Sequence, residues 1–481
     1  MRKALSVIGI FLIGLLLLVP AVTLLIMSVK DYSPIRGLAG SSFVGLDNIA
    51  EVLSNPNLGW VLRNTLVISV LSLVIGAVYL FAAIWAIGTF KNIVMKLVFT
   101  VLFALPASIP GNAYTIMLIH FLPAEILTNS SVLLQVIAAA QIGLRFSAVF
   151  VIAALFTKDN SQNEALRYVL LYAALGLIRI LALDTAFLNG FSNPLTYEHL
   201  DTYETYSYRT GLMQSQFSLY AGRYVVGLLL QLLPAIVGSV LLVMLLKDRA
   251  RVSNRNRNAS DIGNMEKVSP VVVTVVIPVA LLLLVLIAGG GGSLGFEYLS
   301  VAQSYARGII IAAASSVVVV GLGMLLANAA LELKTVGICL VAFLYFISDD
   351  LLGPYLMIRN FGMFNTLAGM VLQNLHWIAP AALIGAVILR SNYSTKKVLA
   401  VSVAALGIGF AWFWGDSMSA TVIASDTSRY TISYVMQQVA SGAAGVQISA
   451  TLYIIVPVLV AGIGIVVGGL MYQSDHEFIK S

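Results

Sequence analysis

Four charged residues inside long apolar runs are the side chains of this sequence best suited to chemistry. Arg145 and Arg179 stand in two runs of the first half, and Asp349 and Asp350 stand together in a run of the second half. A charge near the middle of a bilayer costs about 2.5–3.5 kcal/mol on insertion scales, so such residues usually face a polar cavity or one another. The arginines could bind acidic or hydroxyl groups of a solute, and the aspartates could bind sugar hydroxyls.

Two other roles of these four residues stay open. They could form structural ion pairs between two parts of the chain, or they could lie at the membrane interface. The segment from Asp350 to Pro354, DLLGP, also favours a broken helix, whose freed carbonyl groups must face protein or water.

Three common enzyme motifs are absent from the sequence. It contains no G-x-x-x-x-G-K-[ST], H-E-x-x-H or paired C-x-x-C segment. The histidines lie in separate segments, which favours surface or interfacial roles over a metal site: they are His120, His199, His376 and His476. We therefore expect no enzymatic activity, no metal and no cofactor in this chain.

The single cysteine, Cys339, lies in an apolar run and is expected to be a buried, inert thiol.

The elements that must position these charges are membrane helices. The chain has 481 residues, of which 59% are hydrophobic and 10% charged, with a mean hydropathy of +0.96. Many apolar runs reach the roughly 20 residues needed to cross a bilayer, and they lack the alternation of barrel strands. We expect an all-α integral membrane protein in contact with the lipid bilayer. The twelve expected spans are 5–27, 66–90, 97–121, 131–156, 167–187, 224–246, 269–289, 308–330, 335–358, 377–390, 398–414 and 449–472.

The distribution of basic residues predicts the orientation. Segments on the side of the N-terminus carry about twice as many Lys and Arg residues as the opposite loops, and such segments stay in the cytoplasm. Both termini are therefore expected there, in a multi-pass protein of the cell membrane. The net charge of +6 follows from this topology and does not suggest nucleic acid.

A polar segment divides the chain into two related parts. Residues 247–268 form a basic linker between a first half, 1–246, and a second half, 269–481. Six spans on each side give repeats of the same orientation, related by an axis along the membrane normal. The end of each half aligns at a constant offset, which pairs Met213 with Met436, Gln214 with Gln437, Gly222 with Gly445 and Pro234 with Pro457.

An external loop between the fifth and sixth spans is rich in aromatic and acidic residues. Within it, Tyr203, Glu204, Tyr206 and Tyr208 are candidates for contact with an external protein. An aromatic belt at the membrane interface is the alternative.

Residues 43–48, FVGLDN, and 62–66, LRNTL, resemble the external segment of carbohydrate-type permeases of binding-protein-dependent ABC importers. Residues 359–369, RNFGMFNTLAG, are similar to an external turn of the same family. From the residues themselves, we expect Gly45 to allow a tight turn and Asn64-Thr65 to cap the next span.

The resemblance covers most of the chain, as a fusion of two permease subunits. It implies a translocation path between the halves, an extracellular solute-binding protein, and cytoplasmic ATPase subunits that hold ATP and Mg²⁺.

The chain departs from this family at the cytoplasmic loops that dock into the ATPase. The first-half loop keeps only Glu164-Ala165 of the E-A-A-x-x-D-G-A pattern, and the loop 390–397 keeps nothing of it. Candidate contacts for a cytoplasmic partner are therefore Glu164 and the linker residues Arg249, Arg251, Arg255 and Arg257.

The sequence thus favours a permease component of an ABC-type importer for a sugar-like or other small polar solute. A degenerate permease acting as a membrane scaffold or receptor subunit, and a secondary transporter, remain the alternatives.

Overall fold

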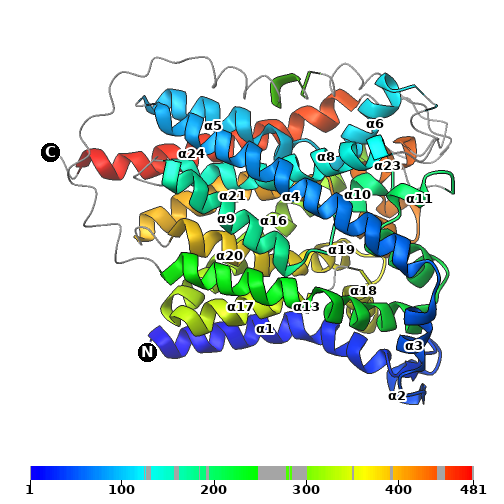
Figure 1. Cartoon of the computed structure of the whole chain (residues 1–481). Coiled ribbons are helices and arrows are strands. Elements are labelled where there is room, and N and C mark those ends of the chain that lie inside the picture. The colour runs from blue at the N-terminus through cyan, green and yellow to red at the C-terminus, as the bar shows by residue number, and fades with distance from the viewer. Residues whose placement is uncertain are drawn as a thin grey trace.

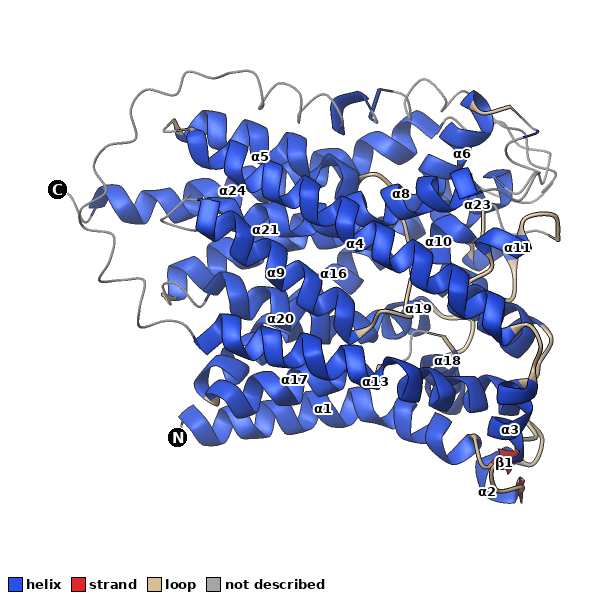
Figure 2. Cartoon of the chain, in the orientation of Figure 1, coloured by secondary structure: helices blue, strands red, loops and turns tan. Residues whose placement is uncertain are grey.

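The computed structural model describes most of the chain, apart from short gaps and most of the segment between the two halves. The described residues are 2–90, 92–123, 125, 132–156, 162–183, 185–190, 194–247, 278–280, 282–283, 301–348, 351–389, 394–440 and 450–478. Within them the regular secondary structure is helical apart from a short antiparallel pair of strands, with loops between the helices (Figure 2).

The described part of the first half contains long helices and a folded loop, 194–216, which we call the outer loop after its expected position. Its elements are α1 (Arg2–Met27), β1 (Lys30–Asp31), α2 (Gly37–Gly40), β2 (Ser42–Phe43), α3 (Asp47–Ser54), α4 (Leu58–Thr89), α5 (Ile93–Ser108), α6 (Gly111–Phe121), α8 (Val132–Phe150), the 3₁₀ helix η1 (Val151–Leu155), α9 (Gln162–Ile178), α10 (Thr185–Leu188), α11 (Tyr197–Leu200), α12 (Tyr203–Ser207), the π-helical turn η2 (Tyr208–Met213) and α13 (Phe217–Lys247).

The described part of the second half is also helical. Its elements are α16 (Val301–Glu332), α17 (Lys334–Ile347), α18 (Leu352–Asn360), α19 (Leu367–Gln373), η3 (Asn374–Trp377), α20 (Ile378–Leu389), α21 (Thr395–Trp414), α22 (Met418–Ile423), η4 (Thr427–Arg429), α23 (Ile432–Ala440) and α24 (Ala450–Phe478). The start of α1 and the end of α24 lie on the same side of the molecule, at the left of Figure 1.

The same packing relations recur in both halves. Helix α4 packs against α8 and α9, and α16 packs against α20 and α21. Helix α13 packs against α9, just as α24 packs against α21. Both α13 and α24 contain an internal proline, Pro234 and Pro457. Helix α1 lies across the second half, against α16 and α18.

Eight helices of the described chain are long and apolar enough to cross a membrane, or ten if each bent helix pair is one span. The protein is thus a multi-pass membrane protein of long helices, but this number is lower than the twelve spans expected. Two of the differences have clear causes. The span expected at 269–289 lies almost entirely outside the described residues. The span expected at 167–187 is shorter, because α9 ends at Ile178.

Two helix pairs are sharply bent. Helices α5 and α6 differ in direction by 79°, so the region of the expected span 97–121 is a bent helix pair rather than one straight helix. Pro110 cannot donate the backbone hydrogen bond that would continue α5, and α6 begins directly after it. Helices α17 and α18 differ by 89°. That break occurs where the DLLGP segment predicts a broken helix.

The Asn-Thr pair of the first half lies inside a helix rather than at its cap. Helix α4 begins at Leu58, six residues before Asn64. The Asn64 amide instead donates to the carbonyl oxygens of Glu198 (2.9 Å) and Asp201 (3.2 Å). The expected cap is therefore wrong, and the pair holds the outer loop against α4. Gly45 does adopt a positive φ of 64°, as its turn requires.

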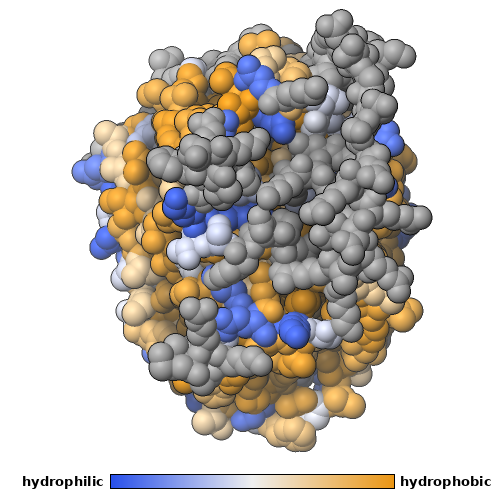
Figure 3. All heavy atoms as spheres, turned by 90° about the vertical axis from the view of Figure 1, so that its left-hand side faces the viewer, coloured by the Kyte–Doolittle hydropathy of each residue, from blue (hydrophilic) through white to orange (hydrophobic). Residues whose placement is uncertain are grey.

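Exposed apolar side chains cover the flanks of the long helices. Phe11, Val78, Leu233 and Ile463 are each more than half exposed, as expected for helices that face lipid. Figure 3 shows the face where α1 begins, on which hydrophilic side chains gather toward the middle and hydrophobic ones surround them. Cys339 is exposed on α17, so the expectation of a buried thiol is wrong.

Candidate functional site

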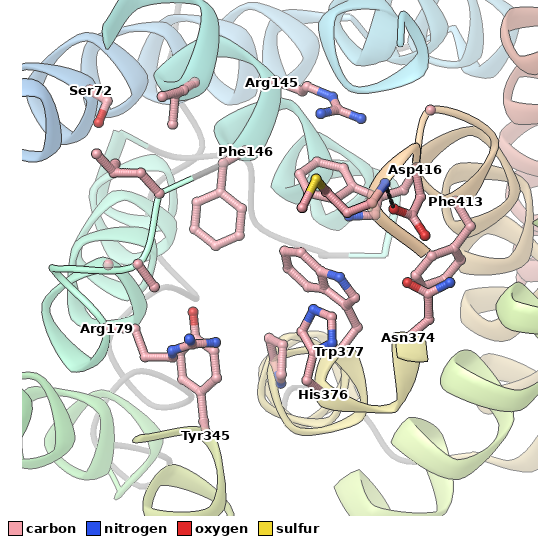
Figure 4. Close-up of a pocket in the computed structure, with 18 of the residues that line it drawn as sticks. Ser72, Arg145, Phe146, Arg179, Tyr345, Asn374, His376, Trp377, Phe413 and Asp416 are labelled. Carbon is pink, nitrogen blue, oxygen red and sulfur yellow. Dashed lines mark hydrogen bonds between the residues drawn. The ribbon is translucent and has the colours of Figure 1, made fainter. Parts of the chain in front are cut away.

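A central cavity of about 180 Å³ lies between the two halves. Its walls come from α4, α8 and α9 of the first half and from α17 and the segment α19 to α22 of the second half. Figure 4 shows the labelled side chains around this common space. The polar and aromatic residues among its lining are Ser69, Ser72, Arg145, Phe146, Tyr172 and Arg179 on one side, and Tyr345, Gln373, Asn374, His376, Trp377, Trp412, Phe413, Asp416 and Ser419 on the other.

Arg145 lies on α8 and is only 3% exposed. Its guanidinium carbon lies 4.4 Å from the centre of the Trp412 ring, a cation–π contact between the two halves. Gly415 leaves room for it, because a Cβ atom there would lie 3.1 Å from an Arg145 Nη atom. The charge expected inside a membrane helix is therefore buried at the central cavity.

Arg179 follows the end of α9 and reaches the same cavity. It donates a hydrogen bond of 3.3 Å to the Ser348 hydroxyl and lies 3.9 Å from the Glu204 carboxylate. Its guanidinium carbon is 5.8 Å from the centre of the Tyr345 ring. Since Ser348 and Tyr345 belong to the second half, Arg179 also joins the halves.

Asp416 is the carboxylate that the structure brings to this cavity. It follows the end of α21, as Arg179 follows the end of α9. One carboxylate oxygen accepts hydrogen bonds from the backbone N–H groups of Met418 (2.9 Å) and Ser419 (3.2 Å). These bonds hold the negative charge in place beside the opening of α22.

The remaining wall combines indole rings with amides. The Trp377 and Trp412 ring centres are 5.1 Å apart in an edge-on arrangement. Asn374 donates to the Ser315 hydroxyl (3.2 Å), and the Gln373 amide donates to the Leu351 carbonyl (3.2 Å). A few fixed polar groups beside aromatic faces form the usual chemistry of a small-molecule site.

The two sequence-predicted aspartates, Asp349 and Asp350, lie outside the described residues, as do Arg249, Arg251, Arg255 and Arg257 of the linker. Their assigned roles stay predictions. Of the four intramembrane charges, the structure thus brings Arg145 and Arg179 together.

The candidate partner residues of the first-half outer loop are largely packed into the protein. Tyr203 and Tyr206 are buried, and Tyr208 and Glu204 are half-buried. The Tyr203 backbone N–H donates to the Thr65 hydroxyl (2.8 Å), and the Tyr206 hydroxyl accepts a bond from Asn55 (3.1 Å). A contact with an external protein through these residues stays a prediction.

The same loop holds a buried ion pair. Arg209 lies 2.5 Å from the Asp201 carboxylate and 3.8 Å from the centre of the Tyr197 ring. Burial raises the pKa of Asp201 above its usual value, although Arg209 and Thr205 act in the opposite direction. The loop is therefore a folded cap on the first half.

Glu164, the candidate cytoplasmic contact, lies in the first turn of α9. Its carboxylate forms an ion pair of 2.9 Å with Arg167, one turn later. Both side chains are less than one-fifth exposed. The contact of Glu164 with a cytoplasmic partner stays a prediction.

Sequence reasoning missed several cavity residues. His376, for which a surface or interfacial role was expected, lines the cavity with Asn374 and Trp377. The segment NLHW, 374–377, carries polar residues directly before an apolar run, and the segment FAWFWGD, 410–416, ends an apolar run with aromatic residues and a carboxylate. Both patterns could have indicated a cavity. Among the described residues, no group of three His, Cys, Asp or Glu side chains could hold a metal ion.

Comparisons with protein families, with curated proteins and with solved structures gave no match to this chain.

Proposed function

We propose that this protein is the membrane permease of an ABC-type importer, with a path between its two halves for a sugar-like or other small polar solute. The observation that carries the proposal is the central cavity, to which both halves contribute side chains. Buried charges at such a place are costly unless they serve a polar cavity. Arg145 and Arg179 supply donors there, and Asp416 supplies an acceptor.

The proposed architecture has twelve membrane helices in two parallel repeats of six, with both termini in the cytoplasm of a cell-membrane protein. The recurring packing of the helices supports it, and so does the basic character of the loops on the side of the N-terminus. Residues 247–268 are the proposed cytoplasmic join.

The proposed partners are cytoplasmic ATPase subunits and an extracellular solute-binding protein. The sequence has no phosphate-binding loop of its own, so ATP and Mg²⁺ would belong to the ATPase. The family resemblance at residues 43–48 and 62–66 supports these partners. Glu164 and the arginines of the linker are the candidate contacts on the cytoplasmic side.

A secondary transporter is the second candidate function. The buried charges of Arg145 and Arg179 favour it, because transporters of that class place ionisable side chains near the middle of the membrane. A membrane scaffold or receptor subunit is the third, since the cytoplasmic docking pattern is reduced to Glu164-Ala165.

Purification from the native membrane separates these functions. The complex is solubilised gently, its subunits are identified, and uptake of labelled sugars is measured in vesicles with and without internal ATP. The importer predicts an associated ATPase and uptake that requires ATP. Uptake that depends on a proton gradient and not on ATP would establish the secondary transporter. A complex that takes up no solute under either condition would favour the scaffold.

A further inference from the structure

A second cavity, of about 110 Å³, adjoins the central one. We call it the apolar cavity, because apolar side chains and glycines line it. Its walls come from α8, η1, α16, α20 and α21, and include Val320, Met324, Ile384 and Ala405. An apolar cavity of about 150 Å³ in another protein stays free of water and binds benzene. The apolar cavity here therefore suits a short alkyl or aryl group.

Five side chains line both cavities. They are Phe146, Trp377, Pro380, Trp412 and Phe413, and three of them are labelled in Figure 4. We call these four aromatic rings and Pro380 the aromatic partition, because they form part of the wall of both cavities. Indole rings suit such a boundary, because they present an apolar face and one polar N–H group.

The described lining of the central cavity holds charges of both signs. Arg145 and Arg179 supply guanidinium groups and Asp416 supplies a carboxylate. Glu204 lies outside this lining, with its carboxylate 3.9 Å from Arg179. A group with many hydroxyls can use donors and acceptors of this kind at the same time, which an anion cannot.

We propose that the solute is an uncharged amphiphile, with a polyhydroxyl head in the central cavity and a short apolar group in the apolar cavity. The proposal rests on the proposed function for its transport, but it concerns binding and is tested by binding alone. The head meets Arg145, Asp416 and Asn374 in the central cavity, and the apolar group lies beside Ala405 in the apolar cavity.

The test compares three probes: glucose, hexanol and hexyl glucoside. Binding to the purified protein in phosphatidylcholine nanodiscs is measured by calorimetry. The heat of probe uptake into the lipid of protein-free nanodiscs is measured separately and subtracted. Hexyl glucoside is expected to bind at least about tenfold more tightly than glucose, because each buried CH₂ contributes about 0.8 kcal/mol. Hexanol alone, which lacks the head, is expected to bind weakly.

A filled apolar cavity should remove this advantage. Ala405→Leu places three more carbon atoms in the apolar cavity, so hexyl glucoside should then bind no better than glucose, while the affinity for glucose is kept. Ala313→Leu is the matched control, because Ala313 is exposed on α16. The proposal is overturned if hexyl glucoside and glucose bind equally to the native protein. It is also overturned if Ala405→Leu and Ala313→Leu give the same ratio.

A further arm identifies the source of the amphiphile. A two-chain glucolipid is added to the nanodiscs before titration with hexyl glucoside. Competition indicates a membrane lipid as the natural ligand, and absence of competition indicates a soluble glycoside. Both outcomes keep the proposal. Uptake experiments play no part in this test, so a failure of the importer function leaves its result intact.

Discussion

The two halves build similar helix frameworks but line the central cavity with different chemistry. The first half contributes both guanidinium groups, Arg145 and Arg179, whereas the second contributes indole rings, amides and Asp416. Helix packing depends on close contacts such as that of Gly143 with the Ser72 backbone, which leave little freedom. Side chains that line the cavity are less constrained by helix packing. Two similar helix frameworks can therefore place different side chains on the two sides of one solute.

The largest expected effect comes from removing the guanidinium group of Arg145. Arg145→Ala should weaken the binding of hexyl glucoside by about tenfold to a hundredfold, because hydrogen bonds to a charged group contribute about 1.5–3 kcal/mol. Arg359→Ala removes the same charge at an exposed position of α18 and should leave the affinity unchanged. Calorimetry in nanodiscs measures both.

Arg145→Lys sharpens this test. The lysine keeps the charge but loses the planar contact with Trp412, so it should recover part of the affinity. If the Arg145→Ala variant and the native protein bind hexyl glucoside equally, the guanidinium group of Arg145 has no role in binding.

The next effect concerns two tyrosines that join the halves at the helix bends. The Tyr453 hydroxyl lies 2.6 Å from Asn112 Oδ1 and 3.1 Å from Ser433 Oγ, in the bend of the first half. The Tyr224 hydroxyl donates to the Ile347 carbonyl (2.5 Å), in the bend of the second half. Tyr453→Phe should lower the free energy of unfolding by about 1–3 kcal/mol, because Asn112 and Ser433 are buried.

Tyr224→Phe should cost less, about 0.5–1.5 kcal/mol, since it removes one bond at a half-buried site. Thermal unfolding of the two variants in the same detergent gives the comparison. Equal losses would show that the two bends are held equally.

A smaller effect concerns pH. The outer loop of the first half, 194–216, and the loop 417–431 of the second half should respond to pH in opposite directions. Because the pKa of Asp201 is raised by folding, its protonated form stabilises the folded protein. This stability is fully present when the pH is below the pKa in the unfolded chain, about 3.9, and is lost as the pH rises through the pKa in the folded protein. Hydrogen bonds from Ser428 and Asn365 lower the pKa of Asp426. Its contribution is present above the unfolded value and is lost as the pH falls.

Hydrogen exchange as a function of pH measures both loops separately. Protection of residues 194–216 should fall as the pH rises above about 3.9, and protection of residues 417–431 should fall as the pH drops below about 3.9. Asp201→Asn and Asp426→Asn should each flatten the response of its own loop only. A parallel response of the two loops would refute the assignment.

The smallest effect is expected at Glu164. Glu164→Gln breaks its ion pair with Arg167 and should change the free energy of unfolding by about 0.5 kcal/mol or less. The same variant should weaken co-purification of an ATPase if the partner contact is correct. Arg167→Gln breaks the same pair while keeping the carboxylate, and serves as the matched control.

The sequence predicts much of this fold because apolar length is a strong signal. The ends of α1 and α16 lie within a few residues of the expected spans or extend them. Helix breaks are harder to foresee. Pro106 lies inside α5, whereas Pro110 lies at the bend between α5 and α6. A proline in an apolar run therefore does not by itself locate a bend.

The candidate site was foreseen in part. Arg145 and Arg179 are conspicuous because charge is rare in apolar runs, and the structure places both at one cavity. Asp416 was missed because it follows the end of its apolar run and looked like an ordinary loop residue. The aromatic partition was missed because Trp and Phe are common in membrane helices, and only tertiary packing distinguishes a cavity wall from a lipid-facing surface.

Arg179 and Asp416 stand at similar places, just beyond α9 and α21, yet they carry opposite charges. In a dimer of identical subunits, every substitution appears twice, and an arginine beyond one helix would bring a second arginine to the same cavity. Two halves in one chain are inherited together but mutate separately. The covalent join therefore allows a complementary pair of charges to arise one residue at a time, without passing through a form in which two like charges share the cavity.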